Sequence, residues 1–158
     1  MKLKYIKWIP AAIVMIIIFA FSAKPAEHSN DSSKIIAEQI LNVYENITNN
    51  EYEYNVRERL IDKINHYVRK SAHFLEYALL GFCICFHLTI IKITGLKQFL
   101  YATALSALYA SSDEIHQYFV PGRSCQLTDI LLDSCGAATG ALLLIFILYL
   151  INVIKRKR

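Results

Sequence analysis

Ionisable side chains within otherwise apolar segments are the most informative feature of this sequence. Glu76 and His73 stand in one such segment, and Asp113 stands at the end of another. A charged group near the bilayer centre costs a few kcal/mol, so such groups usually face the interior of a helix bundle and mark a functional site. The candidate catalytic residues are therefore His73, Glu76, Asp113, Glu114, His116, Asp129 and Asp133.

Helical spacing gathers these residues on shared faces. At about 100° per residue, Arg69, His73 and Glu76 fall within an arc of roughly 60°. Two further sets each share a face: Asp113, His116 and Gln117 in one helix, and Asp129, Asp133, Gly136 and Gly140 in the next. The two glycines have the G-x-x-x-G spacing, which lets a neighbouring helix approach closely.

Basic and amide side chains beside these faces suit an anionic ligand. Arg69, Lys70 and Arg123 are predicted to hold phosphate or another anionic head group, and Gln117 to assist them. The acidic and imidazole groups offer acid–base pairs whose pKa values burial can separate.

The elements that must position these residues follow from composition. The chain has 158 residues, 55% of them apolar and 19% charged, and the formal net charge is 17 − 13 = +4. The apolar residues form four blocks, which argues against a soluble globule, a disordered chain or a disulfide-stapled secreted module. We predict one domain of the all-α class, an integral membrane four-helix bundle. Its crossings are expected at about 5–23, 71–91, 97–116 and 130–153.

Two alternatives stay open for these blocks. Buried helices of a soluble protein would explain the shorter ones. The first block also fits a cleavable signal peptide, with Lys2, Lys4 and Lys7 before an apolar core.

Basic clusters predict the orientation. They precede the first crossing, lie between the second and third, and end the chain, so both termini are expected in the cytoplasm. The loops 24–70 and 114–129 then lie outside, and the polar clusters of three crossings meet on the outer side. Because the basic residues flank the membrane rather than cover one face, nucleic acid is excluded as a partner.

The outer loop 24–70 is predicted to contain two amphipathic helices lying on the membrane or over the bundle. Residues 24–30 are expected to form a loop, and Ser33 is expected to cap the first helix. Residues 46–50 are expected to separate the two helices.

Three stretches contain most of the candidate residues: RKSAHFLEY at 69–77, SDEIHQYFVPGR at 112–123, and the stretch from Asp129 to Gly140. They resemble the motifs of the VanZ-like family of membrane proteins, and Phe21-Ser22 is similar to the first motif of that family. The chain departs from the family at 30–65, where no motif is found, and at Lys24, where the family often has glutamine. The resemblance implies a small multi-pass protein of the bacterial cytoplasmic membrane. It also implies a contribution to resistance to the glycopeptide teicoplanin, but it implies no particular reaction.

Three functions compete at this point. The first is binding or modification of a membrane lipid, such as a lipid-linked cell-wall precursor, or of another anionic envelope molecule. The second is a metal-dependent envelope enzyme, in which the imidazole and carboxylate groups bind Zn²⁺ or Mn²⁺. The third is a non-enzymatic membrane protein that shields a surface target.

Overall fold

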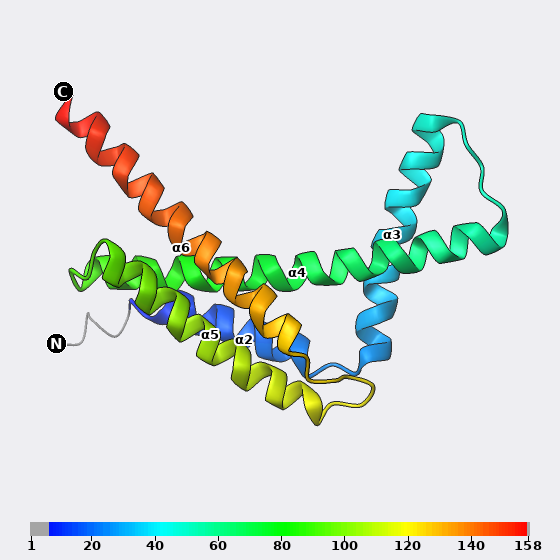
Figure 1. Cartoon of the computed structure of the whole chain (residues 1–158), viewed down its shortest axis with the longest axis horizontal. Helices are drawn as coiled ribbons and strands as arrows, with labels where there is room; N and C mark the ends of the chain where they lie inside the picture. Colours follow the sequence, from blue (N-terminus) through cyan, green and yellow to red (C-terminus); the bar gives the residue numbers. More distant parts are fainter. Residues whose placement is uncertain (1–6, 158) are drawn as a thin grey trace.

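The chain is helical throughout the part that the computed structural model describes, residues 7–157, apart from short connections (Figure 1). The helices are α2 (Ile9–Ser22), α3 (Ala26–Thr48), α4 (Tyr54–Ile90), α5 (Leu96–Tyr118) and α6 (Leu127–Arg156). The predicted all-α class is thereby confirmed. Residues 5 and 6 of the first predicted crossing, and the basic Lys2 and Lys4, lie outside the described residues.

The long helix α4 joins two elements that the sequence predicts separately. The predicted crossing 71–91 and the amphipathic helix before it form one helix of 37 residues. No glycine or proline interrupts the chain from Tyr54 to Leu80, so nothing in the sequence breaks the helix there. At 1.5 Å per residue α4 is about 55 Å long, well beyond the roughly 30 Å hydrocarbon core of a bilayer.

Helix α3 begins earlier than the sequence predicts. Residues 26–30 are helical rather than a loop, because the chain turns into the helix directly after Pro25, the residue at the N-cap. The prediction that Ser33 caps this helix is therefore wrong: Ser33 is a buried residue of its second turn, and its hydroxyl donates to the carbonyl of Ser29. The predicted break at 46–50 is confirmed. Helix α3 ends at Thr48, and the next residue, Asn49, adopts the left-handed conformation.

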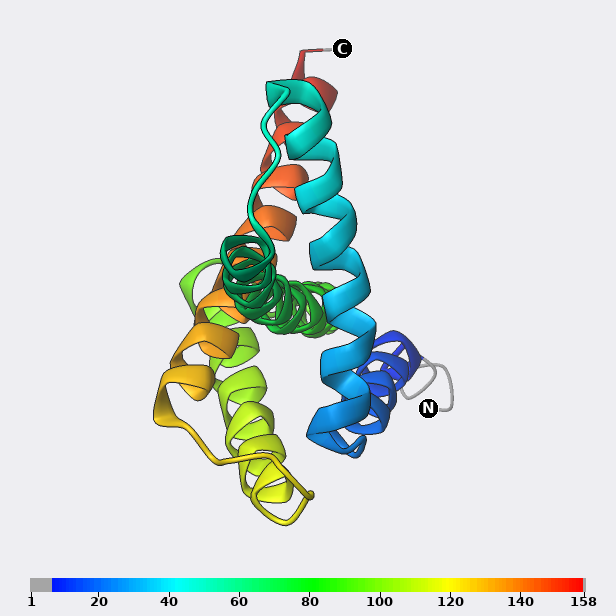
Figure 2. The same cartoon turned by 90° about the vertical axis from the view of Figure 1, so that its right-hand side faces the viewer.

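The helices form a bundle, and α3 lies across its direction. Figure 1 shows α2, α5 and the second half of α4 side by side, with α6 crossing α4 obliquely. Helix α3 turns away from α2 by 102° and passes beside the first half of α4 (Figure 2). Ala37 and Leu41 of α3 pack there against Ile61.

Small residues bring α4 and α6 into close contact. A Cβ atom on Gly136 would overlap the carbonyl of Phe74, and one on Gly140 would overlap that of Ala78. Gly81 on α4 has the same relation to the carbonyl of Ala137. The close approach predicted from the G-x-x-x-G spacing is therefore present, and its partner is α4.

Within residues 7–157, two helices, α4 and α6, are long and apolar enough to cross a membrane, and α2 with α3 passes the same criterion as a bent pair. Along α6, Leu142, Phe146 and Leu150 are exposed on the outside of the bundle. Such an apolar surface suits contact with lipid. The protein is thus a membrane protein, and the four crossings stay a prediction.

Replacing Gly140 by alanine should loosen the α4–α6 contact. The added methyl group forces the helices apart, at a cost of about 1–3 kcal/mol. Thermal unfolding in detergent should show a lower midpoint for Gly140→Ala and no change for Cys135→Ala, at an exposed position of the same helix. Equal midpoints for the wild type and Gly140→Ala would contradict the close approach.

Candidate functional site

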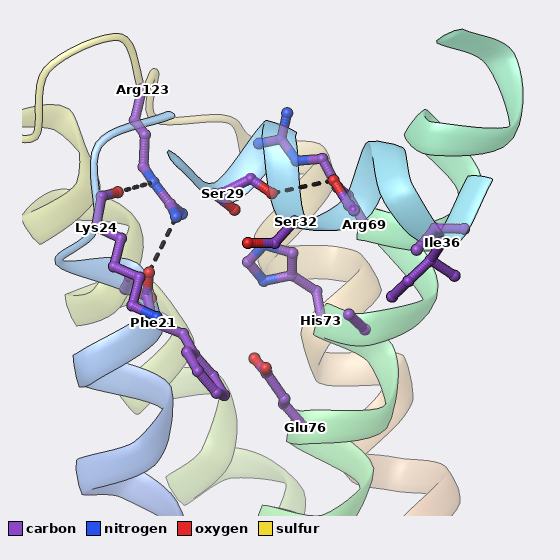
Figure 3. Close-up of a pocket in the computed structure, with 13 residues that line it drawn as sticks. Phe21, Lys24, Ser29, Ser32, Ile36, Arg69, His73, Glu76 and Arg123 are labelled. Atoms are coloured by element: carbon purple, nitrogen blue, oxygen red, sulfur yellow. Dashed lines mark hydrogen bonds between the residues drawn. The ribbon is translucent and has the colours of Figure 1, made fainter. Parts of the chain in front are cut away.

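A cavity of about 310 Å³ lies where α2, α3, α4 and the loop after α5 meet (Figure 3). Its charged and imidazole lining comes from separate segments: Lys24, Arg69, His73, Glu76 and Arg123. The cavity therefore combines cations, one carboxylate and one imidazole.

Helix α4 supplies three of these side chains from a single face. Arg69, His73 and Glu76 all line the cavity, as their predicted arc requires. In Figure 3 the ring of His73 and the carboxylate of Glu76 both point into it. The helical spacing read from the sequence is thus realised in space.

Helix α3 forms a wall that the sequence prediction missed. Ser29, Ser32, Ser33 and Ile36 line the cavity. Their spacing of three or four residues is a helical signal, but residues 24–30 were expected to be a loop. Hydroxyl groups on this wall add hydrogen-bonding capacity opposite Arg69.

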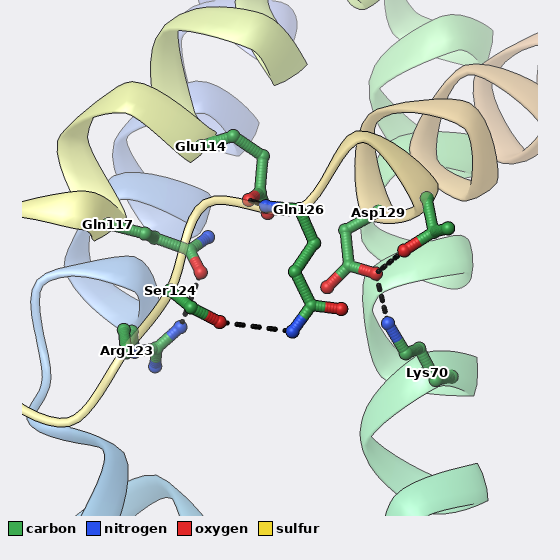
Figure 4. A network of polar contacts seen from close by, with 8 residues as sticks. Lys70, Glu114, Gln117, Arg123, Ser124, Gln126 and Asp129 are labelled. Carbon is green, nitrogen blue, oxygen red and sulfur yellow. Dashed lines mark hydrogen bonds and ion pairs between the residues drawn. The ribbon is translucent and has the colours of Figure 1, made fainter.

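Arg123 ties the loop after α5 to the end of α2. Its Nε donates to the carbonyl of Lys24 and one Nη to that of Phe21, both at 3.0 Å (Figure 3). The other Nη donates to Oε1 of Gln117 at 3.1 Å (Figure 4). Helix ends leave carbonyls without intrahelical donors, and this arginine supplies donors to two carbonyls at and just after the end of α2.

Burial and neighbouring carboxylates act on the pKa of Arg123 in opposite directions. Burial lowers the pKa of its guanidinium, the nearby Arg69 lowers it further, and Asp113, Glu114 and Glu76 act in the opposite direction. An arginine stays protonated at neutral pH despite such a shift, so Arg123 contributes a fixed positive charge to the cavity.

A buried hydrogen-bond network adjoins the cavity between α2 and α5. Oδ2 of Asp113 accepts from the hydroxyl of Ser22 at 2.7 Å and from Nε2 of Gln117 at 2.8 Å. Ser22 also lines the cavity, and Gln117 contacts Arg123. Asp113 therefore reaches the cavity through its partners.

His116 does not line the cavity with His73. Its ring stacks on Phe19 of α2, with centroids 4.6 Å apart. The helical offset from Asp113 turns His116 toward Phe19, while Asp113 meets Ser22.

Lys70 lies on a different side of α4 from Arg69 and forms an ion pair with Asp129 of α6 (Figure 4). Adjacent helical residues differ by about 100°, which separates the two cations. Nearby, Oε2 of the buried Glu114 accepts from the backbone N–H of Gln126 at 2.9 Å, just before α6 begins. These contacts therefore join α4 to α6, and α5 to the start of α6, outside the cavity.

A comparison with protein families covers nearly the whole chain. The model of the VanZ/LLP1 family matches residues 7–150. The chain belongs to the VanZ/LLP1 family. No curated protein and no solved structure matches it.

Asp133 is the most deeply enclosed charged residue of the candidate set in this VanZ/LLP1 protein. Its side chain is fully buried, and neither carboxylate oxygen has a hydrogen-bond partner among the described residues. It is not a lining residue of the cavity. A buried carboxylate without partners is costly, so packing alone does not account for an acid here.

The candidate metal ligands do not converge within residues 7–157. No group of three His, Cys, Asp or Glu side chains there is arranged to hold a metal ion. His73 and Glu76 face the cavity, Asp129 faces Lys70, and Asp133 is enclosed between helices. The divalent-metal hypothesis therefore gains no support from this geometry.

The two aspartates of α6 should respond oppositely to neutralisation. Asp129→Asn removes the ion pair with Lys70 and should lower the thermal midpoint in detergent slightly, because the pair is partly exposed. Asp133→Ala removes a buried acid group that has no hydrogen-bond partner among the described residues, and it should raise stability by on the order of 1 kcal/mol. A lower midpoint for Asp133→Ala would mean that the carboxyl group is stabilised in the folded protein.

Proposed function

We propose that the cavity binds the anionic head group of an envelope molecule, such as a lipid-linked cell-wall precursor, at the outer face of the bacterial cytoplasmic membrane. The observation that carries the proposal is the convergence of Lys24, Arg69 and Arg123 on one cavity. Glu76 is the one carboxylate among its described lining residues. The excess of positive charge favours an anion.

Arg69 supports the proposal most directly. No carboxylate forms an ion pair with its guanidinium within residues 7–157, whereas the adjacent Lys70 is paired with Asp129. A half-buried arginine with free donors is suited to bidentate contact with a phosphate or carboxylate ligand.

The proposed orientation places this cavity outside the cell and both termini in the cytoplasm. Lys92 and Lys97 flank the connection from α4 to α5, and Lys155 and Arg156 end α6. In Figure 1 the connection from α4 to α5 and the C-terminal end of α6 lie on the side of the bundle away from α3. The positive-inside rule therefore favours an outward-facing cavity.

His73 and Glu76 add an acid–base pair to the same cavity. An imidazole and a carboxyl group about one turn apart can move a proton to or from a bound head group. The proposal therefore extends to modification of the ligand as well as its binding.

Removing the charge of Arg69 should release the ligand. Arg69→Gln removes charge-assisted hydrogen bonds worth about 1.5–3 kcal/mol, so we expect roughly ten- to a hundredfold less copurifying anionic lipid. Mass spectrometry of the protein purified in mild detergent measures this amount. Arg59→Gln is the matched control, since Arg59 is an exposed residue of the same helix outside the cavity. Equal retention by both variants would contradict the proposal.

The family resemblance extends the proposal to teicoplanin. We expect deletion of the gene to lower teicoplanin tolerance and the wild-type gene to restore it. Asp113→Ala should fail to restore it at normal membrane levels, because Asp113 holds Ser22 and Gln117 beside the cavity. Asp31→Ala, at an exposed acid of α3, is the control. Full restoration by Asp113→Ala, measured as growth inhibition with immunoblots of membranes, would reject this role.

A further inference from the structure

We infer that the ligand is a single-chain lipid phosphate whose hydrocarbon chain lies in an apolar groove between α3 and α4. The inference rests on the proposed head-group cavity and adds a second binding site to it, for the chain.

The groove has a volume of about 550 Å³ and an apolar lining drawn from both helices. Ile40 comes from α3, while Val68, Ala72 and Leu75 come from α4. Ile40 is 47% exposed and Leu75 is 64% exposed, so large apolar side chains stand here without a protein partner. A hydrocarbon chain would cover them.

The groove continues directly from the cavity. Val68 and Ala72 line both. On α3, Ile36 lines the cavity, and Ile40, one turn further along, lines the groove. Figure 3 shows Ile36 projecting from α3 toward α4. A head group beside Arg69 therefore has an unbroken apolar route for its chain past Ala72.

The distribution of charge identifies the occupant. Lys24, Arg69 and Arg123 line the cavity, and the described lining of the groove contains no charged residue. A soluble anion would leave the groove empty, and a neutral lipid would leave the cations uncompensated. An amphiphile with one anionic end satisfies both regions, and a single groove accommodates a single chain. Phosphate suits the head group because arginine binds its oxygens in pairs.

The test separates the chain site from the head-group site. Wild-type protein in phosphatidylcholine nanodiscs is titrated with hexadecyl phosphate, inorganic phosphate or hexadecanol, and bound ligand is counted by native mass spectrometry. Ala72→Trp fills the junction between cavity and groove, and Ala12→Trp makes the same change at an exposed position of α2. Hexadecyl phosphate should bind the wild type and Ala12→Trp alike, and Ala72→Trp at least about tenfold more weakly, because the chain loses its buried position.

A second pair of variants tests the inference even if Ala72→Trp does not fold. Ile40→Asn places an amide in the groove, while Ile47→Asn makes the same change at a 77% exposed position of the same helix. Only Ile40→Asn should weaken binding of hexadecyl phosphate. Equal losses in the two members of either pair would overturn the inference.

The outcomes distinguish the two proposals. Arg69→Gln should weaken hexadecyl phosphate binding, and hexadecanol should bind poorly. Inorganic phosphate should bind less tightly than hexadecyl phosphate if the groove holds the chain. Equally tight binding, unaffected by Ala72→Trp, would overturn the role of the groove and leave the proposed head-group site in place. Failure of the wild type to bind either phosphate would overturn the proposed function itself. Equal affinity for dioleoyl phosphatidic acid would overturn the single-chain assignment.

Discussion

Arg123 holds together segments that are far apart in the sequence, and the cavity depends on this contact. Its guanidinium satisfies the carbonyls of Phe21 and Lys24 where α2 ends, and it also contacts Gln117 on α5. The backbone N–H of Ala26 adds a hydrogen bond to the carbonyl of Pro121 in the same loop. The sharp turn into α3, and hence the serine wall of the cavity, is fixed by these bonds. Arg123 thus both shapes the cavity and contributes charge to it.

The close crossing of α4 and α6 determines which groups the acidic residues of α6 contact. Glycines let the two backbones meet, so Asp129 reaches Lys70 near the start of α6, while Asp133 is enclosed one turn further along the helix. The ion pair is partly exposed at the edge of this contact. The acids of α6 therefore belong to the helix interface, whereas the cavity draws on α4, α3 and the loop at Arg123.

Helical periodicity predicted which side chains share one face of a single helix. Spacing alone indicated the shared face of Arg69, His73 and Glu76 and the small-residue face of α6, and the family match spans both. Periodicity could not tell which neighbour a polar side chain would meet. Lys70 pairs with α6, and His116 stacks on α2, because these choices depend on the packing of other helices. The wall from α3 was missed for a local reason, since a proline among polar residues suggested a loop.

The uninterrupted length of α4 has a geometric consequence. Its first half packs against α3, its middle lines the cavity, and its second half lies in the bundle, all within one unbroken rod. The glycine contact with α6 lies part-way along this rod. Each residue of a helix is placed 1.5 Å and about 100° from the one before it. One helix therefore sets the register of Arg69 relative to both the α3 contact and the bundle.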